Sequence, residues 1–217
     1  MKKISFIILL FLFTSLFGQS KKYQVGVGVN QSWFDYEVDL LNETETDFRP
    51  KINFVLNYNF LEYEDIKATF GIRYYHLGRS ITVDYLNAKT ETVSMNHYFI
   101  SIPIQGKYKL NFINTDIIIN AETSYMLVSN SKAPSPYNSI ITERNTIDEM
   151  KRFQFSVGGG LEYNFQIGTE SFGIRSMLNF TLTNIPKQET FVDESGSEFS
   201  WVNYKAMEVN ILASYYF

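Results

Sequence analysis

Two histidines are the first candidates for acid–base or metal chemistry in this chain, because it contains no cysteine. His76 and His97 each lie in a segment where apolar and polar residues alternate. Counting along these segments places His76 on an apolar face with Tyr74, and His97 on a polar face with Ser101. Groups on opposite faces share a metal ion only where a bulge intervenes. We therefore predict no catalytic residue, no metal site and no cofactor; the alternative is a hydrolase in which a histidine, a serine and an acid meet on one face.

Four charged side chains interrupt the polar faces of the alternating segments and form two potential pairs: Lys107, Glu122, Glu162 and Arg175. Two-residue turns at 114–115 and 168–169 would place the first two opposite each other, and likewise the last two. Each pair would join a base to an acid, which is expected in an interior because a buried charge without a partner is costly. We interpret the pairs as structural ion pairs of a packed interior; the alternative is a polar plug or a gated path.

The segments that carry these residues share a period of two and are typically about ten residues long, the length that a tilted strand needs to cross a bilayer. There are eight of them: 23–33, 51–60, 66–75, 98–109, 116–127, 152–165, 171–182 and 208–217. Short and long connections alternate between them, with long polar ones at about 37–49, 78–96, 129–151 and 184–203. The pattern predicts an all-β fold, an eight-stranded antiparallel up-and-down transmembrane β-barrel of OmpA/OmpX-like architecture.

Aromatic residues near the ends of the apolar faces favour a membrane location: Tyr23, Trp33, Tyr58, Tyr74, Tyr98, Tyr108, Tyr125, Tyr163 and Tyr215. They resemble the aromatic girdles of outer-membrane barrels. The opposite faces are rich in Gly, Ser and Asn, which suits a narrow lumen. The alternative is a soluble lipocalin-like ligand-binding barrel, whose outward polar face would favour Lys and Glu. Eight strands leave an interior just wide enough for side chains, so we do not expect a general porin.

The first 20 residues have the layout of a secretory signal peptide. Lys2 and Lys3 precede an apolar run at 4–13, and small and polar residues follow. We expect residues 1–20 to be removed on export and residues 21–217 to form the barrel domain in the outer membrane. Because the chain has no cysteine, disulfides and a lipoprotein anchor are excluded. The net charge of -4, without a basic patch, argues against nucleic acid as a partner.

The last ten residues alternate in the same way and stop on an aromatic ring. In a closed barrel the last strand pairs with the first and leaves no open edge. The ending also resembles the C-terminal signal of bacterial outer-membrane barrels, which implies recognition by the barrel assembly machinery. The residues that carry this resemblance share one face: Val209, Ile211, Ala213, Tyr215 and Phe217.

Three further stretches, together with this ending, resemble the PorT-like outer-membrane β-barrel family of the Bacteroidetes (outer membrane protein beta-barrel domain). They are "YFISIPIQGKYKL", "FQFSVGGGLEYNF" and "GIRSMLNFTLTNI". The resemblance implies a barrel that works with protein secretion. We expect a structural or interaction role, with secretion or envelope proteins contacted through the long loops, and with lipid, lipopolysaccharide and the assembly machinery as further partners. The competing class is an outer-leaflet lipid-modifying enzyme.

Overall fold

The computed structural model describes residues 22–37, 43–46, 50–85, 89–134, 141–186, 190–192, 198–200 and 202–217. The expected signal peptide at 1–20 lies outside them. Within these ranges, no helix has both the length and the apolar character needed to span a membrane. Eight strands form the wall of the molecule: β1 (Tyr23–Glu37), β3 (Lys51–Tyr63), β4 (Ile66–Tyr85), β5 (Lys89–Leu110), β6 (Thr115–Pro134), β8 (Phe153–Ile167), β9 (Glu170–Thr181) and β12 (Val202–Tyr216).

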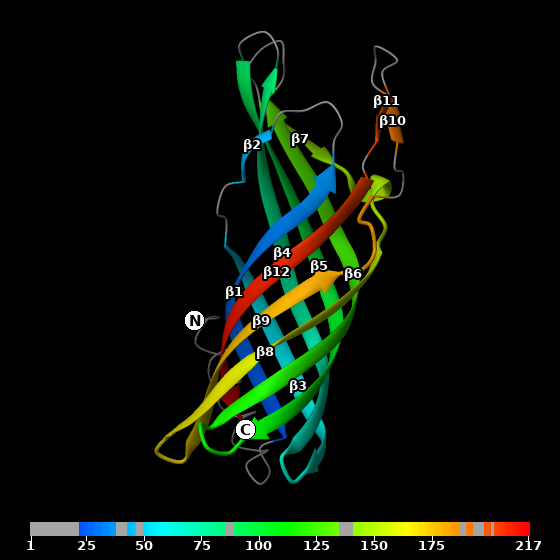
Figure 1. Cartoon of the computed structure of the whole chain (residues 1–217). Helices are drawn as coiled ribbons and strands as arrows, with labels where there is room; N and C mark the ends of the chain where they lie inside the picture. Colours follow the sequence, from blue (N-terminus) through cyan, green and yellow to red (C-terminus); the bar gives the residue numbers. More distant parts are fainter. Residues whose placement is uncertain are drawn as a thin grey trace, which may run out of the picture.

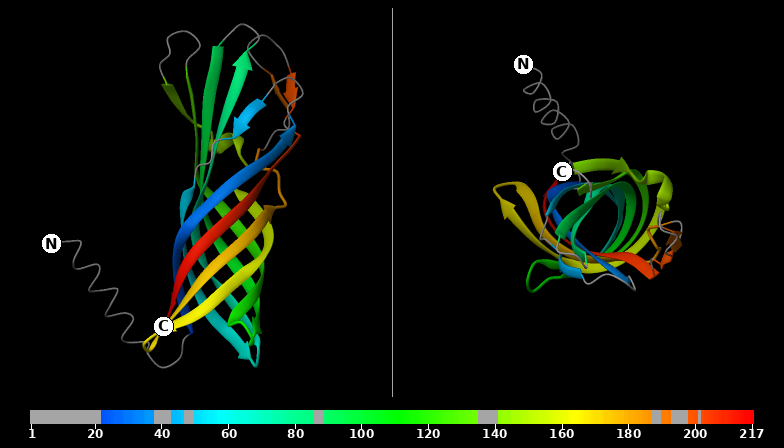
Figure 2. Two further views of the ribbon diagram at one scale, coloured as in Figure 1. Left: turned by 60° about the vertical axis from the view of Figure 1, so that its left-hand side comes forward. Right: turned by 90° about the horizontal axis from the view of Figure 1, so that it is seen from above.

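The wall is a closed antiparallel barrel. Its strands follow one another in sequence order, and β12 returns to pair with β1. The view from above in Figure 2 shows the ring that results, and Figure 1 shows the tilt of the strands. At the seam, the backbone N–H of Tyr23 donates to the carbonyl of Phe217 at 2.9 Å, and the N–H of Phe217 donates back at 3.0 Å. The predicted eight-stranded antiparallel barrel is confirmed.

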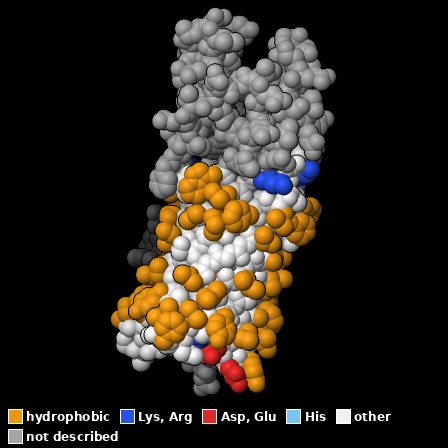
Figure 3. Space-filling model, in the orientation of Figure 1, with side chains coloured by type: hydrophobic (Ala, Val, Ile, Leu, Met, Phe, Trp, Pro, Cys, Tyr) orange, Lys and Arg blue, Asp and Glu red, His pale blue; other side chains and the backbone are white. Residues whose placement is uncertain are grey.

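Alternation decides which side chains face outward. On β3, Ile52 is 58% exposed and Phe54 is 49% exposed. Asn53, which lies between them, is buried, and so is Asn57 further along the same strand. We call the outward-facing hydrophobic side chains the apolar belt, and Figure 3 shows those on one face of the barrel. The barrel is therefore apolar outside and polar inside, as a wall that faces lipid requires. A lipocalin-like soluble barrel has the opposite arrangement, so that alternative is wrong.

Three neighbouring strands are longer than predicted. β4, β5 and β6 have 20, 22 and 20 residues, and β4 and β5 stay paired up to Tyr85 and Lys89. Most of the expected loop at 78–96 is thus a hairpin. The sequence analysis did not predict these strands because the alternating apolar residues of this segment are few and lie among charged residues. The short strands β2 (Glu43–Thr46) and β7 (Ile141–Asn145) pair with β4 and β6. We call the parts of β4, β5 and β6 beyond the barrel, together with β2 and β7, the external sheet (Figure 1).

The remaining short elements also belong to the long connections. They are η1 (Ile147–Glu149), which precedes β8, and a separate two-stranded sheet of β10 (Thr190–Val192) and β11 (Glu198–Ser200).

Short turns connect the strands at the other end of the barrel. The turn between β8 and β9 is the two-residue turn that the sequence predicted, with Gly168 in the left-handed region at φ 63°. The turn between β5 and β6 instead spans 111–114, with Asn114 at φ 50°. Phe112 at its tip is 82% exposed. An apolar residue in a turn looks like a continuing strand, so the sequence placed this turn too late, at 114–115.

A bulge in β6 changes which residues face inward. Leu127 and Val128 are both exposed, at the point where the register against Tyr98 and Phe99 shifts by one. One extra residue reverses the parity of a strand. Beyond the bulge, Ser129 therefore points into the barrel.

Candidate functional site: the barrel lumen

The lumen holds a balanced set of buried charges between the short-turn end and the long-loop end of the barrel. Among the described residues, three bases and three acids point into this part of the lumen, and none is more than 5% exposed: Arg73, Lys107, Arg175, Glu122, Glu162 and Glu208. A further buried acid, Asp116, lies at the short-turn end. The six come from β4, β5, β6, β8, β9 and β12, because the inward positions of the wall strands converge on one axis. Their contacts divide them into two networks.

The first group, the Glu162 network, is centred on one carboxylate. Arg175 lies directly opposite Glu162 on β8 and β9, in the register that the sequence predicted, and donates to it at 3.1 Å. The ammonium of Lys107 lies 2.7 Å from the same carboxylate, and the amide of Gln24 donates to it at 2.6 Å. Two cations and one amide thus hold the fully buried acid, which offsets the cost of removing it from water.

The predicted pairing of Lys107 with Glu122 is wrong. Lys107 lies opposite Ile118, and Glu122 lies opposite Pro103, because the four-residue turn shifts the register of β5 against β6. Both side chains still point into the lumen, as the parity of their strands requires. Lys107 bonds to Glu162, and Glu122 belongs to the second network.

The second group, the Arg73 network, crosses the lumen. The guanidinium of Arg73 on β4 lies 3.3 Å from Glu122 on β6 and forms an ion pair with Glu208 on β12. It also donates to Asn53 at 3.0 Å and lies 4.2 Å from the centre of the Tyr75 ring. Arg73 and Glu208 were not predicted as site residues, although their parity placed both inward. They lie on strands that do not share a hairpin, so counting across a turn could not pair them.

Amide side chains that begin at Arg175 fill the space between the two networks. Arg175 donates to Gln105 at 3.1 Å, Gln105 donates to Asn120 at 3.3 Å, and Asn120 donates to Asn179 at 3.2 Å. The cavity that remains here has a volume of about 10 Å³. That is the space of about one water molecule. The lumen is therefore filled at this level.

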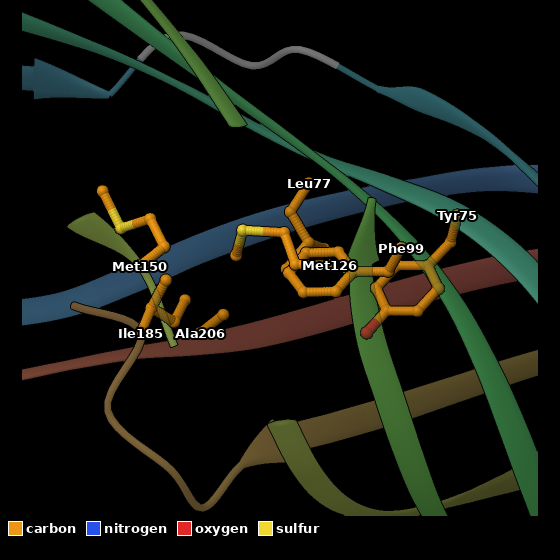
Figure 4. Close-up of a cluster of buried hydrophobic side chains, with 7 residues drawn as sticks. All are labelled: Tyr75, Leu77, Phe99, Met126, Met150, Ile185 and Ala206. Carbon is orange, nitrogen blue, oxygen red and sulfur yellow. The ribbon is translucent and has the colours of Figure 1, made fainter. Parts of the chain in front are cut away.

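Above the Arg73 network, apolar side chains close the long-loop end. We call them the apolar plug, and Figure 4 shows them: Tyr75, Leu77, Phe99, Met126, Met150, Ile185 and Ala206. Tyr75 and Phe99 stack at 5.0 Å between ring centroids. Met150 and Ile185 come from the segments before β8 and after β9, which an isolated bridge between Met150 and Pro186 joins. Described segments of two long connections thus contribute side chains to the plug.

The histidines lie on opposite faces, as parity predicted. His76 stacks on Tyr98 at 4.1 Å between ring centroids. His97 points inward, with Nδ1 2.9 Å from the hydroxyl of Ser129, which in turn lies 2.7 Å from that of Thr146. Sequence counting missed this pair because the β6 bulge turns Ser129 inward. His97 and Ser129 are both 0% exposed, so this pair does not lie on a surface of the molecule.

The short-turn end of the lumen is open. A cavity of about 540 Å³, which we call the vestibule, lies there, and Lys67, Lys109, Asp116 and Tyr216 are among its lining residues. Its inner end is reached by Lys107 of the Glu162 network. In the part of the chain that the structure describes, no three His, Asp or Glu side chains form a group that could hold a metal ion.

A closed barrel with an apolar belt and a polar lumen agrees with the comparison of this chain with protein families. Residues 17–187 match the family model described as outer membrane protein beta-barrel domain. The chain belongs to this family. Its place is the outer membrane, where such a belt faces lipid. A search of curated proteins found no match.

Solved structures of outer-membrane barrels resemble this member of the family. A major outer membrane protein from Thermus thermophilus superposes with a TM-score of 0.50 at 12% identity, over 90% of this chain and 98% of that one. Ail, the attachment invasion locus protein of Yersinia pestis, gives 0.49 at 13% identity, over 90% and 98%. Neisserial surface protein A gives 0.44 at 10% identity, over 91% and 98%. At such identities the likeness concerns the fold.

Family membership also orients the barrel. Short turns of such barrels face the periplasm and long loops face outward, so the vestibule is periplasmic and the apolar plug and external sheet are extracellular. A ladder of aromatic rings marks the periplasmic rim, with successive centroids 5.2 to 6.1 Å apart. It runs in the order Tyr163, Phe165, Phe172, Tyr215, Phe217, Tyr23, Tyr58 and Phe70. The ladder crosses the seam between β12 and β1.

Proposed function

We propose that this protein is a closed outer-membrane barrel that presents its external sheet to an envelope or secretion partner and does not act as a general porin. One observation carries the proposal: side chains fill the lumen between the vestibule and the apolar plug, while β4, β5 and β6 continue beyond the barrel. A filled lumen favours binding at the surface over transport. The resemblance to the PorT-like family of the Bacteroidetes supports a partner in protein secretion.

The test compares two shortened variants of the full protein in native membranes. Replacing residues 81–93 with a two-residue Asn-Gly turn removes the tip of the β4–β5 hairpin and leaves the barrel register intact, because Ser80 and Ser94 on either side of the new turn are already paired. We expect this variant to assemble but to lose a partner that co-purifies with the wild type. Shortening the connection at 187–201 is the control and keeps the partner. A partner that both variants retain, or large stable ion channels formed by the wild type in planar bilayers, would contradict the proposal.

We also propose that outer-membrane lipid and lipopolysaccharide surround the apolar belt, and that the barrel assembly machinery reads the C-terminal strand. The outward position of Ile211, which is 51% exposed, supports a role for the alternating face of β12 in recognition. That the protein is not an enzyme stays a prediction, and the buried pair of His97 and Ser129 gives the lipid-modifying alternative no accessible site.

Deletion of Phe217 is expected to lower the amount of assembled barrel severalfold. Phe217 makes both backbone hydrogen bonds to Tyr23 at the seam, and its ring stacks between those of Tyr23 and Tyr215, each 5.8 Å away. The matched change is Tyr216→Phe, which removes only the hydroxyl that accepts a bond from Gln24 in the lumen. The measurement is the fraction of unheated protein that migrates as a folded barrel on a gel. Equal losses in the two variants would mean that the terminal aromatic is no assembly signal.

A further inference from the structure

The vestibule contains one acid whose position calls for a positively charged partner. Asp116 is 5% exposed, and its Oδ1 atom has no hydrogen-bond partner among the residues that the structure describes. Across the sheet, Asp116 lies directly opposite Glu162 on β8. Like charges that face each other on neighbouring strands are destabilising. Glu162 is neutralised by Arg175 and Lys107, whereas no ion pair in the described residues neutralises Asp116.

Bases line the same cavity on the next two strands. Lys109 lies directly opposite Asp116 on β5, yet within the described chain no ion pair joins them. Lys67 on β4 lies directly opposite Lys107, a second unfavourable pairing of like charges. Lys67 has a half-exposed partner, Glu62, at 2.8 Å, and Lys107 is bonded to Glu162. The vestibule thus holds an acid and a base that face each other without forming an ion pair in the described residues.

We propose that the vestibule binds a small zwitterion, a free amino acid or a short peptide from the periplasm. Its ammonium group would bond to Asp116, and its carboxylate would bond to Lys109, with Lys67 beside it. A cavity of about 540 Å³ has the size of a small-molecule pocket. Each end of such a ligand supplies the charge that the facing side chain lacks, and charge-assisted hydrogen bonds of this kind are the strong ones. The site is separate from the external sheet, so it stands independently of the proposed docking role.

Three probes measure how much each charged group of the ligand contributes to binding. They are L-alanyl-L-alanine, its N-acetyl form without the ammonium group, and its C-terminal amide without the carboxylate. Calorimetric titration uses the full barrel in lipid nanodiscs, which leave the vestibule accessible from solvent. We expect the dipeptide to bind at least about tenfold more tightly than either derivative, because each derivative loses one charge-assisted bond. This comparison needs no variant, so it decides the matter even where a substitution disturbs folding.

Two substitutions then test which side chain binds the ammonium group of the ligand and which binds its carboxylate. Asp116→Asn weakens binding of the dipeptide by about tenfold and leaves binding of the N-acetyl form unchanged. Lys109→Gln weakens the dipeptide and the N-acetyl form and leaves the amide unchanged. Lys132→Met, on the exposed extracellular part of β6, is the control and changes nothing. The proposal is overturned if the wild type does not bind the dipeptide, if the N-acetyl form binds as well as the dipeptide, or if Asp116→Asn weakens both equally.

Discussion

Replacing Glu162 with glutamine is expected to lower the free energy of unfolding of the barrel by about 3–5 kcal/mol. The change leaves two cations, Arg175 and Lys107, buried beside a neutral amide, and both are at most 3% exposed. Removing one member of a buried charge network costs more than the network contributes, because the remaining charges lose their compensation. Unfolding in urea, followed by circular dichroism of the barrel in detergent micelles, gives the free energy.

Two further variants make this result specific. Glu143→Gln removes an acid from an exposed pair with Lys132, at 3.1 Å and about half exposed on both sides, and should cost less than about 1 kcal/mol. Adding Arg175→Met to Glu162→Gln should recover part of the loss, since it removes one of the uncompensated cations. A cost for Glu162→Gln as small as that of the exposed control would show that the lumen is wet enough to screen these charges.

Gly160→Ala is the second change with a large expected effect. A Cβ atom at this position would lie 2.1 Å from the carbonyl oxygen of Ser176 and 2.8 Å from the Cα of Met177, so the backbones of β8 and β9 would have to separate. We expect a loss of about 3 kcal/mol or more in stability, and a low yield of folded barrel. The readout is the unheated gel migration together with urea unfolding.

The adjacent glycine provides the matched control. At Gly159 the nearest atom to an added Cβ is the carbonyl oxygen of Ile118 at 3.2 Å, which a small shift relieves. Gly159→Ala should therefore fold nearly as well as the wild type. If both substitutions reduced folding to the same extent, strand propensity rather than close approach of the two backbones would explain the glycines.

The accuracy of the sequence-based pairing depended on the turns. Gly168 marks a turn by its chemistry, and the register of Glu162 against Arg175 followed from it. The turn before β6 contains Phe112, and an apolar residue at this position makes the turn read as part of a strand. The predicted partner of Lys107 was therefore wrong. The faces of the strands survived this error, because a register shift by an even number of residues does not change which side chains point inward.

The contacts across the lumen could not be predicted from the sequence for a different reason. Arg73 meets Glu122 and Glu208 only because tilt and stagger bring β4, β6 and β12 to one level of the barrel. Tilt and stagger belong to the closed sheet as a whole and leave no local pattern in the chain. The apolar plug did leave a signal: Tyr75, Leu77 and Phe99 are large apolar residues at inward positions. Its partners Met150 and Ile185 come from irregular segments, which no periodicity describes.

The apolar belt also bears on how such a chain reaches its destination. Its members, such as Ile100, Ile102 and Ile104, are separated by inward-facing residues in the sequence and meet only on the finished surface. Beyond the first 21 residues, no stretch supplies the roughly 20 consecutive apolar residues that would lodge in the inner membrane as a helix. The hydrophobic surface forms only when the strands pair and the barrel closes. The apolar belt is therefore a property of the closed barrel and not of any single stretch of the unfolded chain.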